Sequence, residues 1–70
     1  MRMVTAMKLQ RVRKELSQIA LSKKVGIPQC KISVIERGMI PEKGEARKIA
    51  RALNASVNDL FPAYAQEVRG

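Results

Sequence analysis

The segment LSQIALSKKVGIPQCKISVIERG, residues 16–38, decides the fold. Ser17 is a suitable N-cap for a helix over 18–25, and Gly26 ends that helix because glycine readily adopts the left-handed conformation. A proline suits the first turn of a helix, so a second helix is expected over 28–37. Only a few residues separate the two helices, which must therefore meet at a tight corner.

Small and branched residues around this corner predict that the two helices cross closely. Ser22 is small enough for close approach, Gly26 bends the chain without steric cost, and Ile27 fills the corner. The residues expected to hold the pair together are Leu21, Ser22, Val25, Gly26, Ile27, Ile32 and Ile35. The side chains left on the outer side of the second helix are those of Gln29, Cys30, Lys31, Ser33, Val34 and Arg37.

The chain before this pair predicts an amphipathic helix over 6–15, which Thr5 is placed to cap. Leu9, Val12 and Leu16 follow the i, i+3, i+7 spacing of one helical face. We expect this apolar stripe to pack into the core.

The chain after the pair predicts two more helices. Helical periodicity returns over 45–53, and Asn54 suits the left-handed position that follows a helix. Ser56 is an N-cap for a last short helix that carries Leu60 and Phe61. Because no linker, repeat or low-complexity segment is found, we expect residues 1–70 to form a single all-α domain of five helices.

The composition favours a polyanionic partner. Fourteen lysine and arginine residues face six aspartate and glutamate residues, which gives a net charge of +8 in 70 residues. Such a field attracts nucleic acid, although basic residues can also serve only to solubilise a small protein. The placement of the charges must decide between these interpretations.

Several classes of protein are excluded by what the chain lacks. One cysteine and no histidine leave no internal disulfide and no convincing metal site, so neither a metal nor another cofactor is expected. No apolar run approaches the length of a transmembrane helix, and residues 1–7 have neither the apolar stretch nor the cleavage site of a secretory signal, so we expect a cytoplasmic protein without a membrane partner. Paired carboxylates and a phosphate-binding glycine loop are absent as well, which argues against an enzyme and a small-molecule substrate.

Three segments carry a resemblance to a known family: LSQIALSKKVGI at 16–27, KISVIERG at 31–38 and KIARALNASVNDLF at 48–61. Together they make the chain resemble the Cro and phage-repressor type of helix-turn-helix proteins, also called the XRE family, over residues 9–61. The resemblance implies a compact lambda-repressor-like domain that binds double-stranded DNA, with the recognition helix 28–37 in the major groove.

The resemblance also implies roles for individual residues. Gln29 matches a position that commonly contacts base edges, and a glutamine amide can pair bidentately with adenine. The side chains expected to contact bases are those of Gln29, Cys30, Lys31, Ser33 and Val34. Those expected to contact phosphates are Gln18, Arg37, Lys43 and Arg11. For Cys30, a small groove-facing side chain is favoured over a redox sensor, because no histidine lies nearby to activate the thiol.

An ion pair between Arg13 and Glu36 is a further implication, which would make Glu36 a structural residue. The chain departs from the family pattern where KELSQ joins the first two helices, a connection about two residues shorter than usual. Pro28 replaces a side-chain cap, and Lys43 with Gly44 weakens the start of the fourth helix. Met39 or Ile40 is then expected to fill the space beside that start.

Tyr64 and Val68, four residues apart in the tail 62–70, are expected to contact a second subunit, although they could instead cover the same core. A homodimer doubles the short sequence that one recognition helix can contact. The function favoured is a prokaryotic or phage transcription regulator, most simply a repressor on a palindromic operator. The alternatives are a protein-interaction module and a non-specific nucleoid protein on the same fold.

Overall fold

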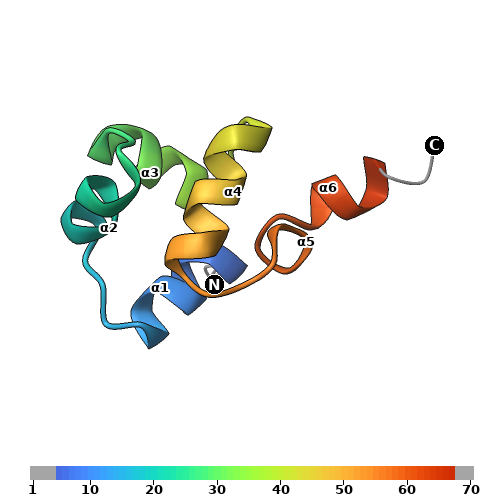
Figure 1. Ribbon diagram of the computed structural model, residues 1–70. Coiled ribbons are helices and arrows are strands. Elements are labelled where there is room, and N and C mark those ends of the chain that lie inside the picture. The colour runs from blue at the N-terminus through green and yellow to red at the C-terminus, as the bar shows by residue number, and fades with distance from the viewer. Residues whose placement is uncertain (1–4, 68–70) are drawn as a thin grey trace.

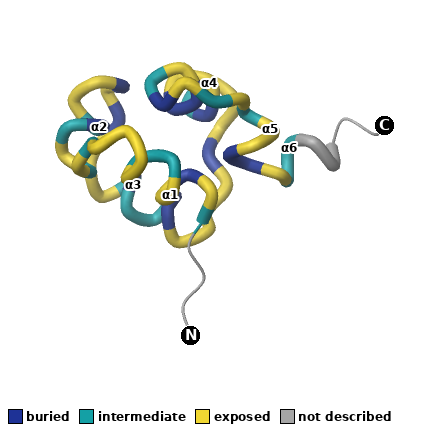
Figure 2. Tube along the Cα trace, turned by 90° about the horizontal axis from the view of Figure 1, so that it is seen from below, coloured by how far each residue is buried: buried dark blue, intermediate teal, exposed yellow. Residues whose placement is uncertain are grey.

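The computed structural model describes residues 5–67, and its elements are all helical over that range (Figure 1). The helices follow one another through short connections, and α5 and α6 lie to one side of the first four in both views (Figure 2). Their bounds are α1 Ala6–Arg13, α2 Gln18–Val25, α3 Gln29–Glu36, α4 Lys43–Ala52, α5 Val57–Leu60 and α6 Pro62–Glu67. The described chain therefore has the five expected helices and a sixth, which begins at a proline, a residue whose fixed φ suits the first helical position.

Side-chain caps set most of the helix starts. Thr5, Ser17 and Ser56 each accept a hydrogen bond from a backbone N–H three residues later, as the sequence predicts. The helix α4 begins two residues earlier than expected, because Glu42 and Glu45 form a capping box. That box compensates for the weak helix formers at the start of α4.

Three helices end in the same way, with a residue of positive φ. These residues are Glu15 (φ 58°), Gly38 (φ 122°) and Asn54 (φ 55°). In each case the next residue donates its N–H to the carbonyl five residues back, at 2.9–3.2 Å, which is the Schellman arrangement. The end of α1 is therefore a defined cap rather than a frayed turn, and Asn54 takes the predicted conformation.

The expectation for the buried face of α1 is wrong. Leu9 and Val12 are 45% and 55% exposed, whereas Met7 is almost fully buried. Gln10 and Arg11, three and four residues after Met7, complete the inner face because their polar groups find internal partners. Periodicity of apolar residues alone could not locate this face, since two of its three members are polar.

The core itself is aliphatic and continuous. Its buried members come from α1 to α5, with Leu16 and Tyr64 packed against its margin. Met39 and Ile40 remain exposed, so neither fills the space before α4, where Pro41 is buried instead. The buried apolar residues are Met7, Leu21, Val25, Ile27, Ile32, Ile35, Ala46, Ile49, Ala50, Leu53, Leu60 and Phe61.

Tyr64 belongs to the chain's own core. Its ring packs edge-to-face on Phe61, with 6.5 Å between ring centroids, and its hydroxyl donates a hydrogen bond to the carbonyl oxygen of Pro41. Tyr64 therefore covers the margin of its own core, which is one of the two interpretations left open by the sequence, and its contact with a second subunit stays a prediction. Val68 lies outside the described residues.

Candidate nucleic-acid interface

The corner between α2 and α3 fixes the angle at which α3 leaves the body. Gly26 takes the left-handed conformation at φ 73°, and the hydroxyl of Ser22 donates to the carbonyl oxygen of Ile27 at 2.5 Å. Ile32 and Ile35 are buried beneath α3. The side chain of Ser22 is small enough for α2 and α3 to approach closely, and its hydroxyl also links the turn to α2.

The opposite side of α3 faces outward. Gln29, Cys30 and Arg37 are exposed, and Lys31, Ser33 and Val34 are half-buried. Pro28 is the N-cap and supplies no side-chain hydrogen bond, so no side chain caps the first N–H groups of α3. This end of the helix carries the positive end of its dipole.

A buried carboxylate holds α3 against two other helices. Glu36, at the end of α3, accepts hydrogen bonds from Arg11 Nε at 2.5 Å and Arg11 Nη2 at 3.2 Å, and from Gln18 Nε2 at 3.0 Å. Arg11 Nη1 also donates to the carbonyl oxygen of Leu16 at 2.6 Å. One carboxylate therefore links α1, the start of α2 and the end of α3.

The partner of Glu36 is Arg11, so the expected pairing with Arg13 is wrong. Arg13 is exposed, whereas Arg11 lies one turn after Met7 on the inner face of α1. The spacing of four residues from Met7 is the signal that could have identified Arg11. Because its guanidinium is engaged inside the protein and its side chain is only 11% exposed, we do not retain Arg11 among the candidate phosphate contacts.

A second ion pair links α3 to α4. Lys31 Nζ lies 2.7 Å from Glu45 Oε2. The hydrogen bond with Glu45 raises the pKa of Lys31, and the same bond lowers the pKa of Glu45. The side chains are 34% and 20% exposed, so the pair adds little to folding stability, but it places a carboxylate beside the outer face of α3.

Comparison with known proteins agrees with this geometry. A helix-turn-helix family model matches residues 7–60. The chain belongs to the helix-turn-helix family of the Cro and phage-repressor type. A comparison with curated proteins gave no match. The family is one of DNA-binding regulatory domains that are not typically enzymatic. Within the matched residues, α2 and α3 with the tight turn at Gly26 have the helix-turn-helix arrangement.

Beside α3, the helix-turn-helix domain has a hollow, and Lys8 at its border was not among the predicted DNA contacts. The hollow is bordered by Lys8 of α1, Gln18 of α2, and Ser33 and Arg37 at the far end of α3. The sequence had not singled out Lys8, although it precedes Arg11 by three residues and shares its side of α1. Lys43 is exposed as the first residue of α4. These cations extend the positive surface beyond the outer face of α3.

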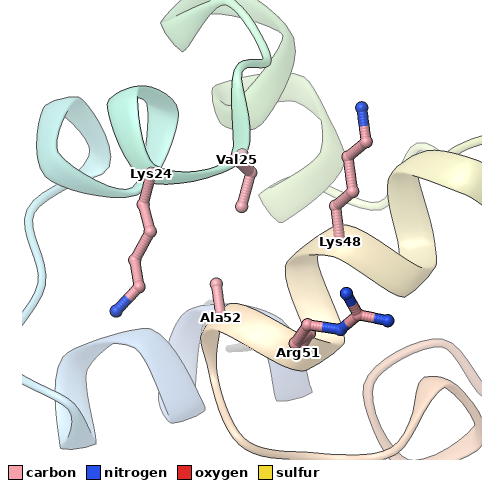
Figure 3. Close-up of a pocket in the computed structure, with 5 residues that line it drawn as sticks. All are labelled: Lys24, Val25, Lys48, Arg51 and Ala52. Atoms are coloured by element: carbon pink, nitrogen blue, oxygen red, sulfur yellow. The ribbon is translucent and has the colours of Figure 1, made fainter.

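A different basic face of the helix-turn-helix domain lies between α2 and α4 (Figure 3). Lys24, Lys48 and Arg51 surround a small hollow into which Val25 and Ala52 project. The three cationic side chains point in different directions, away from one another. In Figure 2, α4 lies on one side of the molecule and α3 with α1 on the other. The positive charge is therefore not confined to the outer face of α3.

Two further findings concern other kinds of site. Within residues 5–67 no group of three or more histidine, cysteine, aspartate or glutamate side chains is arranged to hold a metal ion. Over the same range no helix is long and apolar enough to cross a membrane.

Proposed function

We propose that the protein binds specific sequences in double-stranded DNA and represses transcription, as a homodimer on a palindromic operator. In this proposal α3 enters the major groove and its outward side chains contact base edges. The observation that carries the proposal is the outer face of α3, where Gln29 and Cys30 are exposed while Glu36 anchors the other end of the helix.

The start of α2 supplies the phosphate contact in this proposal. Ser17 accepts the N–H of Ala20, and the earlier N–H groups of the helix have no acceptor within it. A helix N-terminus of this kind binds phosphate oxygens well. The side-chain amide of Gln18, at this helix start, donates to Glu36 at the end of α3. The position of the phosphate contact and the orientation of α3 are therefore linked through this hydrogen bond.

Flanking cations complete the proposed contact with the DNA backbone. Arg37 and Lys43 are exposed at the end of α3 and the start of α4, and Lys8 joins Arg37 at the hollow beside α3. Such contacts fix the position of the protein on the duplex and supply affinity without sequence preference. They also support a location on the nucleoid in a prokaryotic cytoplasm.

Selection of random duplex DNA on the purified protein, at about 150 mM salt, tests the proposal. A two-fold symmetric motif with half-sites about one helical turn apart is expected. A motif without symmetry would contradict the dimer. Retention without any motif would favour a non-specific nucleoid protein. The basic face between α2 and α4 supports that alternative, because it places positive charge away from α3. If no duplex is retained, the DNA-binding proposal fails and a protein-interaction module takes its place.

A further inference from the structure

The carboxylate of Glu45 has two fixed partners on opposite sides. Its Oε1 accepts the backbone N–H of Glu42 at 3.2 Å as part of the capping box of α4. Its Oε2 lies 2.7 Å from Lys31 Nζ on the recognition helix. Because the capping bond holds the carboxylate in place, Lys31 is anchored to the start of α4 rather than extended into solvent.

The charges around Glu45 keep it ionised. The hydrogen bond from Lys31 is the main cause of its lowered pKa, and Lys48, three residues further along α4, adds a Coulombic contribution. A DNA phosphate that approached the free N–H groups of Lys31 would therefore be repelled by the anchored carboxylate beside them. A neutral base edge meets no such repulsion.

We propose that Glu45 is a specificity-determining positioning residue, which withholds the Lys31 ammonium from DNA phosphates and leaves its remaining N–H groups for a guanine edge. An ammonium has three donors, so the bond to Glu45 leaves two for O6 and N7 of guanine. This inference rests on the proposed function, because it assumes that α3 faces DNA bases.

The substitution Glu45→Gln isolates this role. Glutamine at the third position of a helix can still accept the N–H of the capping residue, so the capping box is retained while the ion pair is lost. Glu42→Gln is the matched control, because it removes the same charge from the same helix end, keeps the direct contact between Glu45 and Lys31, and weakens only a smaller Coulombic interaction with Lys31. Circular dichroism spectra and melting temperatures establish that both variants are folded.

The measurement is the salt dependence of binding to a labelled mixed-sequence duplex, followed by fluorescence anisotropy. Each phosphate contact steepens the plot of log K against log salt by about 0.9. We expect Glu45→Gln to be steeper than Glu42→Gln by about that amount, because Lys31 becomes available to a phosphate. At 50 mM salt relative to 200 mM, this corresponds to an additional change in affinity of about threefold.

A double substitution assigns the effect to Lys31. Adding Lys31→Gln to Glu45→Gln should return the slope to that of Glu42→Gln. On the duplex recovered by selection, Glu45→Gln should lower the ratio of specific to non-specific affinity by about threefold or more, whereas Glu42→Gln should leave that ratio unchanged.

Equal slopes for the two single variants, or a steep slope that survives Lys31→Gln, would overturn the role of Glu45. Neither result bears on whether a sequence motif exists. Selection without a motif would overturn the proposed function while the comparison of slopes still decides whether Glu45 restrains Lys31.

Discussion

Arg11 and Glu36 lie 25 residues apart in the chain and form a two-bond ion pair that joins the inner face of α1 to the end of the recognition helix. The carboxylate also holds Gln18, so its loss would release the start of α2 as well. The pair is largely shielded from water, and a buried charge left without its partner is strongly destabilising.

We therefore expect Arg11→Ala to lower the free energy of unfolding by about 3 kcal/mol. Urea denaturation followed by circular dichroism at 222 nm measures this value. Arg13→Ala is the control, since Arg13 is exposed and its loss should cost less than about 0.5 kcal/mol. Similar losses for the two variants would contradict the pairing seen in the structure.

Glu15 offers a stabilising substitution. It occupies the left-handed position after α1 with φ 58°, where a side chain with a Cβ is strained and glycine is not. Glu15→Gly should raise the free energy of unfolding by about 0.5–1 kcal/mol, or the melting temperature by roughly 3–6 °C. The opposite substitution, Gly38→Ala, adds a Cβ at the end of α3, where φ is 122°, and should lower the melting temperature. An unchanged or lower value for Glu15→Gly would argue against this conformation.

The inner face of α1 can be tested with two apolar truncations. Met7→Ala should cost about 2–4 kcal/mol, because the side chain is 1% exposed and its removal leaves a cavity in the core. Leu9→Ala, at an exposed position two residues away, should cost under about 1 kcal/mol. Chemical denaturation compares the two, and the reverse order would mean that Leu9 faces the core after all.

The proposed contacts to bases and phosphates should respond differently to truncation. Gln29→Ala should reduce discrimination at one or two base positions by about 1–3 kcal/mol per position. Lys43→Ala should weaken all duplexes alike and reduce the salt slope by about 1. Repeating the selection with each variant measures the change in sequence preference, and fluorescence anisotropy at several salt concentrations measures the uniform affinity and the salt slope. If both variants lose affinity uniformly and keep the same motif, α3 is not the helix that contacts the bases.

The sequence predicts local features well because they depend on neighbouring residues. The bounds of α2, the caps at Ser17 and Ser56, and the left-handed Asn54 all follow from residue type and short spacing. The start of α4 at Lys43 was missed because Glu42, the N-cap of its capping box, lies before the predicted helix and glutamate is not among the preferred capping residues.

Contacts between distant segments were harder to predict. The inner face of α1 is partly polar, so hydrophobic periodicity placed Leu9 inside and overlooked Arg11. The link between Lys31 and Glu45 joins two helices whose relative position no local pattern specifies. Tyr64 in the tail could be placed against the core only once Pro41 and Phe61 were located beside it.

The three-helix junction at Glu36 has a consequence for the cost of association. Side chains that become immobilised only on binding lose rotational freedom, at about 0.5–1.5 kcal/mol each. Arg11 and Gln18 are already immobilised by the carboxylate, so this loss is incurred when the chain folds. In the proposed DNA complex the entropic penalty then falls mainly on exposed residues such as Gln29 and Arg37, so a change that stiffens these side chains while keeping their contacts is the direct route to tighter binding.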